Sequence, residues 1–275
     1  MVGMAVIHVD EFLRSRDVAS KTKEHYFYKL GLLAQYVGKR RLSLRLLAEY
    51  PGWLRARGYA DASIQSTVAA ARAYVRWAVE RGYADDECLR WRPRLRLCES
   101  APKAINDQDA ERMIESTQHV RDRALLLMLR DTGARIGTIL GLDVGDIDLS
   151  GGRAIARQKG GRLLILYLSE RLRVALREYI GARQDGPLFL GRDGRMGMGG
   201  VRYILRQAAR RAGVNGRYNA HAWRHAFARR CVRAGLDLSR TARLMGHASF
   251  ELTAKYYAVW DGKELAEAYA RVCGM

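Results

Sequence analysis

A break in composition near residues 90–105 constrains the fold more than any other feature of the sequence. The stretch RWRPRLRLCESAPKA contains two of the four prolines in the chain, together with four arginines and a lysine. Prolines within a dense run of like charges are typical of an exposed connection. The 275-residue chain is therefore predicted to form two domains, residues 1–90 and residues 105–275, joined by a basic linker over residues 91–104.

Both predicted domains carry an excess of positive charge. The chain has 48 Lys and Arg against 29 Asp and Glu, a net charge of +19. Residues 1–100 hold 18 basic and 11 acidic side chains, and residues 101–275 hold 30 and 18. A balance this basic indicates a polyanionic partner for both domains and argues against a small-molecule metabolic enzyme.

Other classes of protein are excluded by what the sequence lacks. The four cysteines show no C-x-x-C spacing and are too scattered to staple a secreted fold, so neither a zinc site nor a disulfide framework is expected. No apolar run approaches 18 residues, and the start MVGMAVIHVDEFL has no basic segment, so we expect a cytosolic protein without a membrane span. Motifs for nucleotide binding and for zinc proteases are missing, and no cofactor is expected. The four cysteines of the chain are Cys88, Cys98, Cys231 and Cys273.

Apolar residues at helical spacing predict an all-helical first domain. One helix is expected to begin at Ser20 as its cap, a second to run over residues 43–57, and a third over residues 61–82, ended by Gly82. Together they predict a compact bundle of about four helices.

The second domain is predicted to mix helices with a small sheet. Residues 152–168 read as two strands around Gly160-Gly161, a dipeptide suited to a tight hairpin turn. Helices before and after these strands favour an α+β arrangement, and the predicted fold class of the chain is mainly α with a small β-sheet. The expected helices are 107–117, 120–132, 170–183, 199–212, 221–234, 237–245, 250–258 and 262–272.

A set of basic, imidazole and phenol side chains is the candidate for chemistry. His221 and Arg224 lie three residues apart at the start of a predicted helix, which places them on one face. Taken singly, each member is more typical of a solvated charge or a structural residue, because the chain has 48 basic residues. The set consists of Arg135 in DTGARIGTILGLDVGDID, Lys159 at the predicted hairpin tip, His221, Arg224, His247 after a glycine, and Tyr256.

Taken together, these residues resemble the tyrosine recombinase, or phage integrase, family. The family pattern is an arginine in T-G-x-R, a lysine in a β-hairpin, H-x-x-R-H, and then G-H with a tyrosine nine residues after that histidine. The order, the spacing and the residue types all agree with this pattern, and the resemblance extends over nearly the whole chain. The matching stretches are TGARIGTILGL, QKGGR, HAWRH and LMGHASFELTAKYY.

The resemblance implies a fold and a reaction. The first domain would be a helical core-binding domain of the SAM-like kind, and the second an α+β tyrosine recombinase catalytic domain. Tyr256 would attack a phosphodiester of double-stranded DNA to give a 3′-phosphotyrosyl bond, and Lys159 would protonate the leaving 5′ oxygen. Guanidinium forks match phosphate oxygens and stay charged, and imidazoles can donate to the same oxygens. Arg135, Arg224, His221 and His247 would therefore stabilise the transferring phosphate without a cofactor.

Three positions qualify the match. Tyr257 follows Tyr256, and successive helical residues point about 100° apart, so only one phenol can face the phosphate; the spacing from His247 favours Tyr256. Many family members have an acid three residues after the first arginine, where this chain has Thr138, and Asp143 or Asp146 are the open alternatives. His225 is common in the family and is left outside the catalytic set.

Further residues are candidates for contacts with DNA and with other protomers. Arginines of the linker would follow the DNA backbone, and the polar face of the third helix would approach a major groove. The stripe Leu265, Ala268, Tyr269 and Val272 in the last helix would dock on a neighbouring protomer, in a tetramer on DNA. The candidate DNA-binding residues are Gln65, Arg72, Arg92, Arg94 and Arg96.

The sequence therefore predicts a Xer-like site-specific recombinase that acts through a Holliday junction in integration, excision or dimer resolution. We expect it in the cytoplasm, associated with the nucleoid through DNA. Two alternatives stay open: a catalytically silent, sequence-specific DNA-binding protein on the same scaffold, and a topoisomerase IB-like enzyme that only relaxes supercoils. The complete set of six candidate residues argues against the first, and the helical first domain argues against the second.

Overall fold

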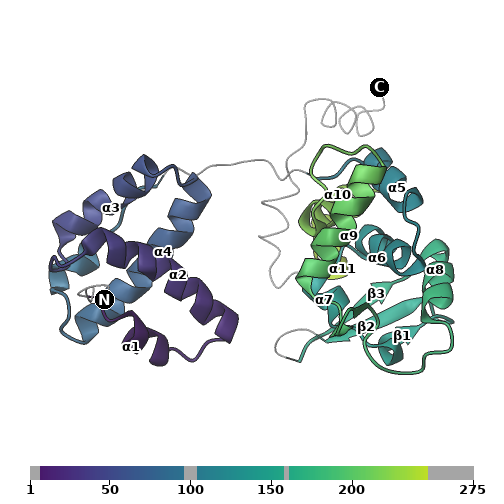
Figure 1. Cartoon of the computed structure of the whole chain (residues 1–275), viewed down its shortest axis with the longest axis horizontal. Helices are drawn as coiled ribbons and strands as arrows, with labels where there is room; N and C mark the ends of the chain where they lie inside the picture. The colour runs from purple at the N-terminus through teal and green to yellow at the C-terminus, as the bar shows by residue number, and fades with distance from the viewer. Residues whose placement is uncertain (1–6, 96–103, 158–160, 247–275) are drawn as a thin grey trace. The chain divides into compact units, whose positions relative to one another are not determined.

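The computed structural model describes residues 7–95, 104–157 and 161–246, and the chain divides into two compact units (Figure 1). The first unit comprises Met1–Ser100 and the second Ala101–Met275. Each unit has a hydrophobic core of its own. No helix among the described residues is long and apolar enough to cross a membrane.

The first unit is helical throughout its described part. Its elements are α1 (Val9–Arg14), α2 (Ser20–Val37), α3 (Leu44–Ala56), α4 (Asp61–Glu80) and a 3₁₀ turn, η1 (Asp86–Arg90). The three long helices match those predicted from apolar spacing. The six-residue α1 and the five-residue η1 were not predicted, because such short elements show no measurable period.

The start of α2 differs from the prediction. Ser20 is the first helical residue, and the capping position is Ala19, which makes no side-chain hydrogen bond. Ser43, by contrast, caps α3: its side chain accepts a hydrogen bond from the amide of Leu46 at 3.3 Å. In both helices a serine marks the start of the helix to within one residue. The presence of the serine alone does not determine whether it is the capping residue or the first helical residue.

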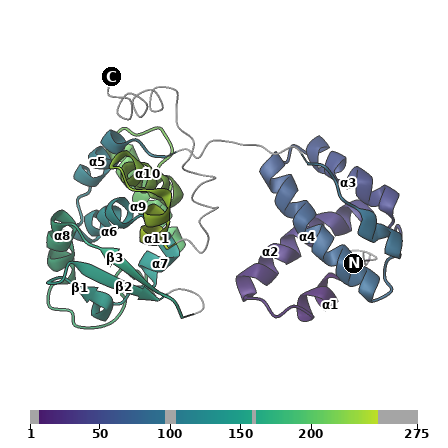
Figure 2. The same ribbon diagram turned by 180° about the vertical axis from the view of Figure 1, so that it is seen from behind.

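The second unit is built around one buried helix, α6 (Val120–Thr132). Its side chains from Ala124 to Leu129 are all buried, as expected for a helix that is covered on every side. α8 (Glu170–Ile180) and α10 (Ala220–Arg233) both pack against it (Figures 1 and 2). The remaining helices are α5 (Asp107–Glu115), α7 (Ile136–Leu140), η2 (Val144–Asp146), α9 (Met198–Arg211) and α11 (Leu238–Met245).

A small antiparallel sheet completes this unit. Strands β2 (Arg153–Arg157) and β3 (Leu163–Tyr167) pair with Ile155 opposite Ile165, and the short β1 (Ile147–Asp148) pairs with β2. Alternate residues of β2 and β3 are buried, which confirms the two predicted strands. The two-residue turn predicted at Gly160-Gly161 is wrong, because the last paired residues are Arg157 and Leu163 and the connection between them is longer. The predicted fold class, mainly α with a small sheet, is confirmed. Two further two-residue strands, β4 (Leu190–Gly191) and β5 (Gly194–Arg195), were not predicted.

Candidate active site

The end of α6 places the first candidate, Arg135. The helix ends at Thr132, and Gly133 adopts the left-handed conformation, with a φ of 56°, that turns the chain. Arg135 follows at the capping position of α7 and is exposed. Its Nη1 donates a hydrogen bond to the carbonyl of Gly246 at 2.7 Å. The catalytic candidate is therefore held between α6, α7 and the end of α11.

The first turns of α10 carry the next two candidates. Asn219 caps the helix by accepting a hydrogen bond from the amide of Ala222 at 2.9 Å, which fixes the start of the helix just before His221. Arg224 follows three residues later and is only 4% exposed. Its Nη1 donates to the carbonyl of Gly133 at 2.6 Å and to that of Met245 at 3.0 Å.

These contacts bring three distant parts of the sequence to one place. Arg224 reaches the carbonyl of Met245, and Arg135 reaches the carbonyl of the next residue, Gly246. The two guanidinium groups therefore meet the chain immediately before His247. His247 itself lies outside the described residues. Two positive side chains that converge in this way form a site suited to an anion.

The two histidines of α10 are neutral at neutral pH. The surrounding protein removes part of the hydration of the His221 ring, and this lowers the pKa of His221 below its ordinary value. The charges of Arg224 and Arg135 lower the pKa further. His225 is buried, and burial, with His221 and Arg224 nearby, lowers its pKa to about 4. The two rings lie edge to face with centroids 4.3 Å apart. The positive charge of the site therefore resides in the guanidinium groups.

The two acids considered as replacements at Thr138 serve the loop after α7. The side chain of Asp143 accepts from the amide of Asp146, the side chain of Asp146 accepts from the amide of Asp143 at 2.9 Å, and Asp143 also pairs with Arg195. Arg195 in turn donates to the carbonyl of Leu140 at 2.8 Å. Within the described part of the chain, these carboxylates thus stabilise the turn that follows the site.

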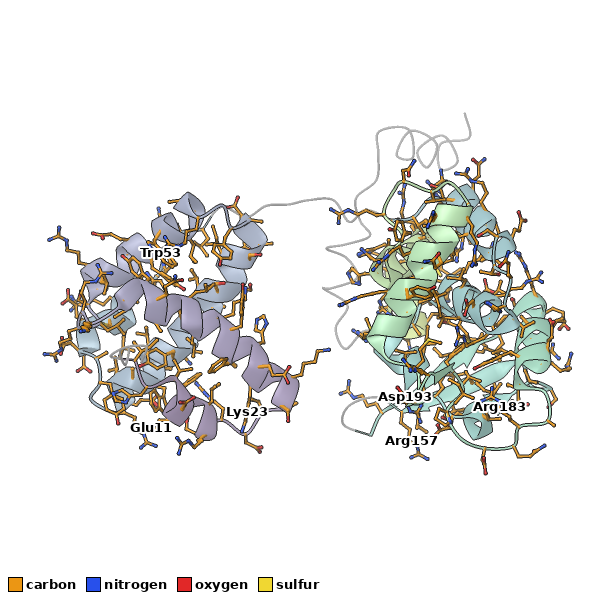
Figure 3. The ribbon with its side chains drawn as sticks, in the orientation of Figure 1. Glu11, Lys23, Trp53, Arg157, Arg183 and Asp193 are labelled. Atoms are coloured by element: carbon orange, nitrogen blue, oxygen red, sulfur yellow. The ribbon has the colours of Figure 1, made fainter. Side chains whose placement is uncertain are left out.

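Three of the six candidates lie outside the described residues: Lys159, His247 and Tyr256. The same holds for Tyr257, for Arg96, and for the two last predicted helices. The strands that lead to and from Lys159 are described, and Arg157 at the end of β2 is exposed and points outward (Figure 3). Among the described residues, no group of three or more His, Cys, Asp or Glu side chains is placed to hold a metal ion.

A hollow of about 470 Å³ adjoins the site. His221 and Ile136 line it from the side of the catalytic candidates, and Arg202 and Arg206 line it from α9. The sequence analysis did not select these two arginines. Their spacing of four residues on a predicted helix was a signal that they share a face, but the same spacing recurs among many of the 48 basic residues.

In the first unit, two of the predicted DNA-binding residues line one hollow. Arg72 of α4 and Arg92, just after η1, both border a space of about 250 Å³, together with Arg76. Gln65 lies seven residues before Arg72 and therefore shares its face of α4. Arg94 is exposed. Arg76 was missed by the sequence analysis, although it follows Arg72 by one helical turn.

The chain has relatives of similar sequence that are named tyrosine recombinases. The chain is 28% identical over 277 residues to tyrosine recombinase XerA of Pyrococcus furiosus, covering 96% of this chain and 93% of the relative. It is 29% identical over 303 residues to tyrosine recombinase XerD of Mycobacterium leprae, with coverages of 96% and 94%.

Solved structures share the fold. The XerH site-specific recombinase bound to its palindromic difH substrate superposes with a TM-score of 0.77 at 19% identity, covering 95% of this chain and 83% of that one. The Tn1549 transposon integrase in complex with circular intermediate DNA gives a TM-score of 0.77 at 17% identity, with coverages of 98% and 100%. Residues 100–262, more than half of the chain, match the sequence profile of the phage integrase family. The chain belongs to the phage integrase family.

Proposed function

We propose that this protein is a site-specific tyrosine recombinase that cleaves and rejoins double-stranded DNA. The observation that carries the proposal is the convergence of Arg135, Arg224 and His221 beside the residues that precede His247. Two guanidinium forks and a neutral imidazole provide hydrogen-bond donors and fixed positive charge for a phosphate in transfer. The membership of the chain in the phage integrase family supports the same conclusion.

The reaction assigns a role to each candidate. The phenolate oxygen of Tyr256 attacks the scissile phosphorus, and the bond from phosphorus to the 5′ oxygen breaks. Lys159 gives a proton to that oxygen, which leaves as a 5′-hydroxyl, while the 3′ phosphate stays on the tyrosine. The 5′-hydroxyl of a second strand then attacks the phosphotyrosyl bond and displaces Tyr256. One exchanged strand per duplex gives a Holliday junction, and exchange of the second strand resolves it.

The cationic side chains act on the charge of the phosphate. In the five-coordinate transition state, the non-bridging oxygens carry more negative charge than in the starting diester. In this proposal Arg135 and Arg224 are the fixed donors that stabilise that charge, and His221 and His247 would donate to the same oxygens. The nearby positive charge also lowers the free energy of the ionised phenol of Tyr256, which otherwise has a pKa near 10.

The rest of the chain is assigned to binding and assembly. Residues 1–90 would act as a core-binding domain and residues 105–275 as the catalytic domain, joined by the basic linker 91–104 along the DNA. A tetramer on DNA, assembled through residues 262–275, would bring four active sites together. Deletion of 262–275 is expected to impair recombination more than cleavage of one strand, and an equal loss of both would count against this role.

A plasmid with two directly repeated copies of a binding site, selected from random DNA, tests the function. A recombinase converts the supercoiled plasmid into two smaller circles, and Tyr256→Phe abolishes these products. Relaxation without smaller circles would indicate the topoisomerase IB-like alternative. Tight binding with neither product would indicate a catalytically silent DNA-binding protein.

A further inference from the structure

One stripe of α10 contacts the last turn of α6, from which Arg135 follows. Arg224, Phe227 and Arg230 are spaced by three residues and therefore lie along one side of the helix. The first has already been placed in the candidate active site. The other two face the same turn of α6 but lie further from the site, and sequence analysis assigned them no role.

Arg230 completes the hydrogen bonding at the end of α6. The last carbonyls of an α-helix have no partner within the helix and must find one elsewhere. Arg230 Nη2 donates to the carbonyl of Arg130, and Arg224 Nη1 donates to the carbonyl of Gly133 at 2.6 Å. Two side chains of α10 thus hold two main-chain oxygens just before Arg135.

Phe227 lies between these two contacts. A Cβ built on Gly133 would lie only 2.2 Å from Cδ1 of the Phe227 ring, so the backbone of the turn rests directly on the ring. The guanidinium carbon of Arg230 is 5.9 Å from the centroid of the same ring. The turn is therefore packed as well as hydrogen-bonded.

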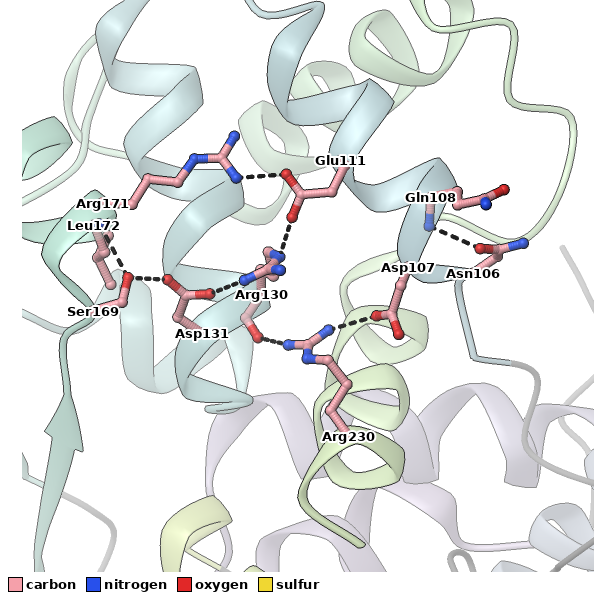
Figure 4. Close-up of polar contacts among 10 residues, drawn as sticks. All are labelled: Asn106, Asp107, Gln108, Glu111, Arg130, Asp131, Ser169, Arg171, Leu172 and Arg230. Atoms are coloured by element: carbon pink, nitrogen blue, oxygen red, sulfur yellow. Dashed lines mark hydrogen bonds and ion pairs between the residues drawn. The ribbon is translucent and has the colours of Figure 1, made fainter. Parts of the chain in front are cut away.

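Arg230 is itself fixed by a third helix. Its Nη1 donates to Oδ1 of Asp107 in α5 at 2.9 Å, so the guanidinium bridges α5 and the end of α6 (Figure 4). The Arg230 side chain is 24% exposed. The Asp107 side chain is 46% exposed, so this ion pair is only partly removed from solvent. The additional hydrogen bond from Arg230 to a main-chain acceptor restricts its geometry more than that of an isolated surface pair.

The opposite side of the turn is held by a separate set of contacts. The Arg130 side chain pairs with Glu111 at 2.5 Å and with Asp131 at 2.8 Å. Asp131 accepts a hydrogen bond from Ser169 at the start of α8 at 2.5 Å, and Glu111 also pairs with Arg171 (Figure 4). These contacts anchor the side chains of the turn, whereas Arg230 anchors its backbone.

We infer that Arg230 is a positioning residue for Arg135, an inference that rests on the proposed function. Only four residues separate the carbonyl that Arg230 holds from Arg135, so the direction of that turn sets where the Arg135 guanidinium lies. A misplacement of about 1 Å can cost on the order of 100-fold in rate when a catalytic group must meet a transition state. Arg230 acts through the backbone and does not itself reach the phosphate.

A double-mutant cycle with Arg135 tests this inference. Single-turnover cleavage is measured with full-length protein already bound to a nicked DNA site. Arg230→Ala is expected to lower the cleavage rate by about tenfold or more, with the dissociation constant for DNA changed by less than about twofold. In the Arg135→Lys background the guanidinium group of residue 135 is already lost. There Arg230→Ala is expected to lower the cleavage rate by less than about a further twofold.

Two variants separate positioning from stability. Arg171→Ala removes an ion pair to Glu111 in the same cluster but leaves the carbonyl of Arg130 bound, so it is expected to keep the wild-type cleavage rate. Arg230→Lys retains donors for Asp107 and the carbonyl and is expected to recover most of the rate. Melting temperatures are recorded for each protein. If Arg230→Ala does not fold, Arg230→Gln, which keeps one donor, replaces it in the cycle.

Additive losses in the two backgrounds would overturn the inference, because a residue that acts through Arg135 has no further effect once Arg135 is impaired. An equal loss in Arg171→Ala would overturn it as well, since it would show a general effect of the ion-pair cluster. Failure of the proposed function looks different: the wild-type protein would then form no covalent product on a tightly bound site.

Discussion

At the scale of single residues, different side chains of the candidate site supply positive charge and neutral hydrogen-bonding groups. Arg135 and Arg224 supply permanent positive charge, while His221 and His225 have pKa values below the ordinary value and are neutral at pH 7. A neutral imidazole can donate one hydrogen bond and accept another. In the proposed reaction His221 would therefore move a proton as well as bind an oxygen, and the buried ring of His225 packs edge to face against it.

The buried histidine makes stability depend on pH. His225 has a pKa of about 4 in the folded protein and about 6.5 when unfolded, so the unfolded chain binds more protons below pH 6.5 and stability falls with acidification. We expect His225 to account for a loss of about 2 kcal/mol in unfolding free energy between pH 7 and pH 5. Urea unfolding at the two pH values measures this. His225→Gln should remove most of that loss, and replacement of the exposed His119 should not.

Spacing and order in the chain identified the six candidates of the family pattern, of which the structure describes Arg135, His221 and Arg224 and brings them together. The pattern did not point to Arg230, since the role of one basic residue among 48 becomes evident only when its acceptor on α6 is known. Nor could it decide what Asp143 and Asp146 do. Their reciprocal capping depends on backbone geometry in a three-residue 3₁₀ turn, which leaves no periodic signal.

At the scale of elements, the junction between α6 and α10 explains the glycine before Arg135. Gly133 has a φ of 56°, and a Cβ at this position would overlap the ring of Phe227. Both the backbone conformation and the close approach require glycine. The long helices around this junction follow from apolar periodicity, whereas α7, with five residues, and the two-residue strands are too short to show one.

Gly133→Ala is expected to destabilise the protein by about 2–4 kcal/mol, from the left-handed backbone and from overpacking against Phe227. In a Phe227→Ala background the packing part of this cost should disappear. Gly133→Ala should therefore cost less free energy of unfolding in that background than in the wild-type protein. Gly137→Ala is the control, because nothing lies within 4 Å of its Cβ position. Equal costs of Gly133→Ala in the two backgrounds, from chemical denaturation, would contradict the packing described here.

At the scale of the whole molecule, positive charge is spread over both units, as expected for contacts with a long polyanion. The sequence predicted a division into two parts from prolines and charges in the connecting stretch, and the chain divides after Ser100. How the units are arranged on DNA cannot be deduced from periodicity, because it depends on contacts with the DNA itself.

Arg72, Arg76 and Arg92 line one hollow of the first unit, and their contribution to DNA binding can be measured through its salt dependence. If Arg72 and Arg92 each contact one phosphate, replacement of either by alanine should reduce the slope of log Kd against log salt by about 0.9. Binding titrations at several salt concentrations measure the slope. Arg45 is highly exposed and pairs with Glu49 at 3.7 Å on α3; its replacement should leave the slope unchanged. Equal slopes for all three variants would contradict the assignment.

The most direct test of the central claim is a covalent trapping experiment on a nicked DNA site, from which the short cleaved strand diffuses away. The account predicts an adduct through the 3′ phosphate that forms with the wild type and with Tyr257→Phe but not with Tyr256→Phe. Digestion and mass spectrometry would then place the nucleotide on Tyr256. An adduct that persists in Tyr256→Phe, or a complete absence of adduct on a tightly bound site, would contradict the account.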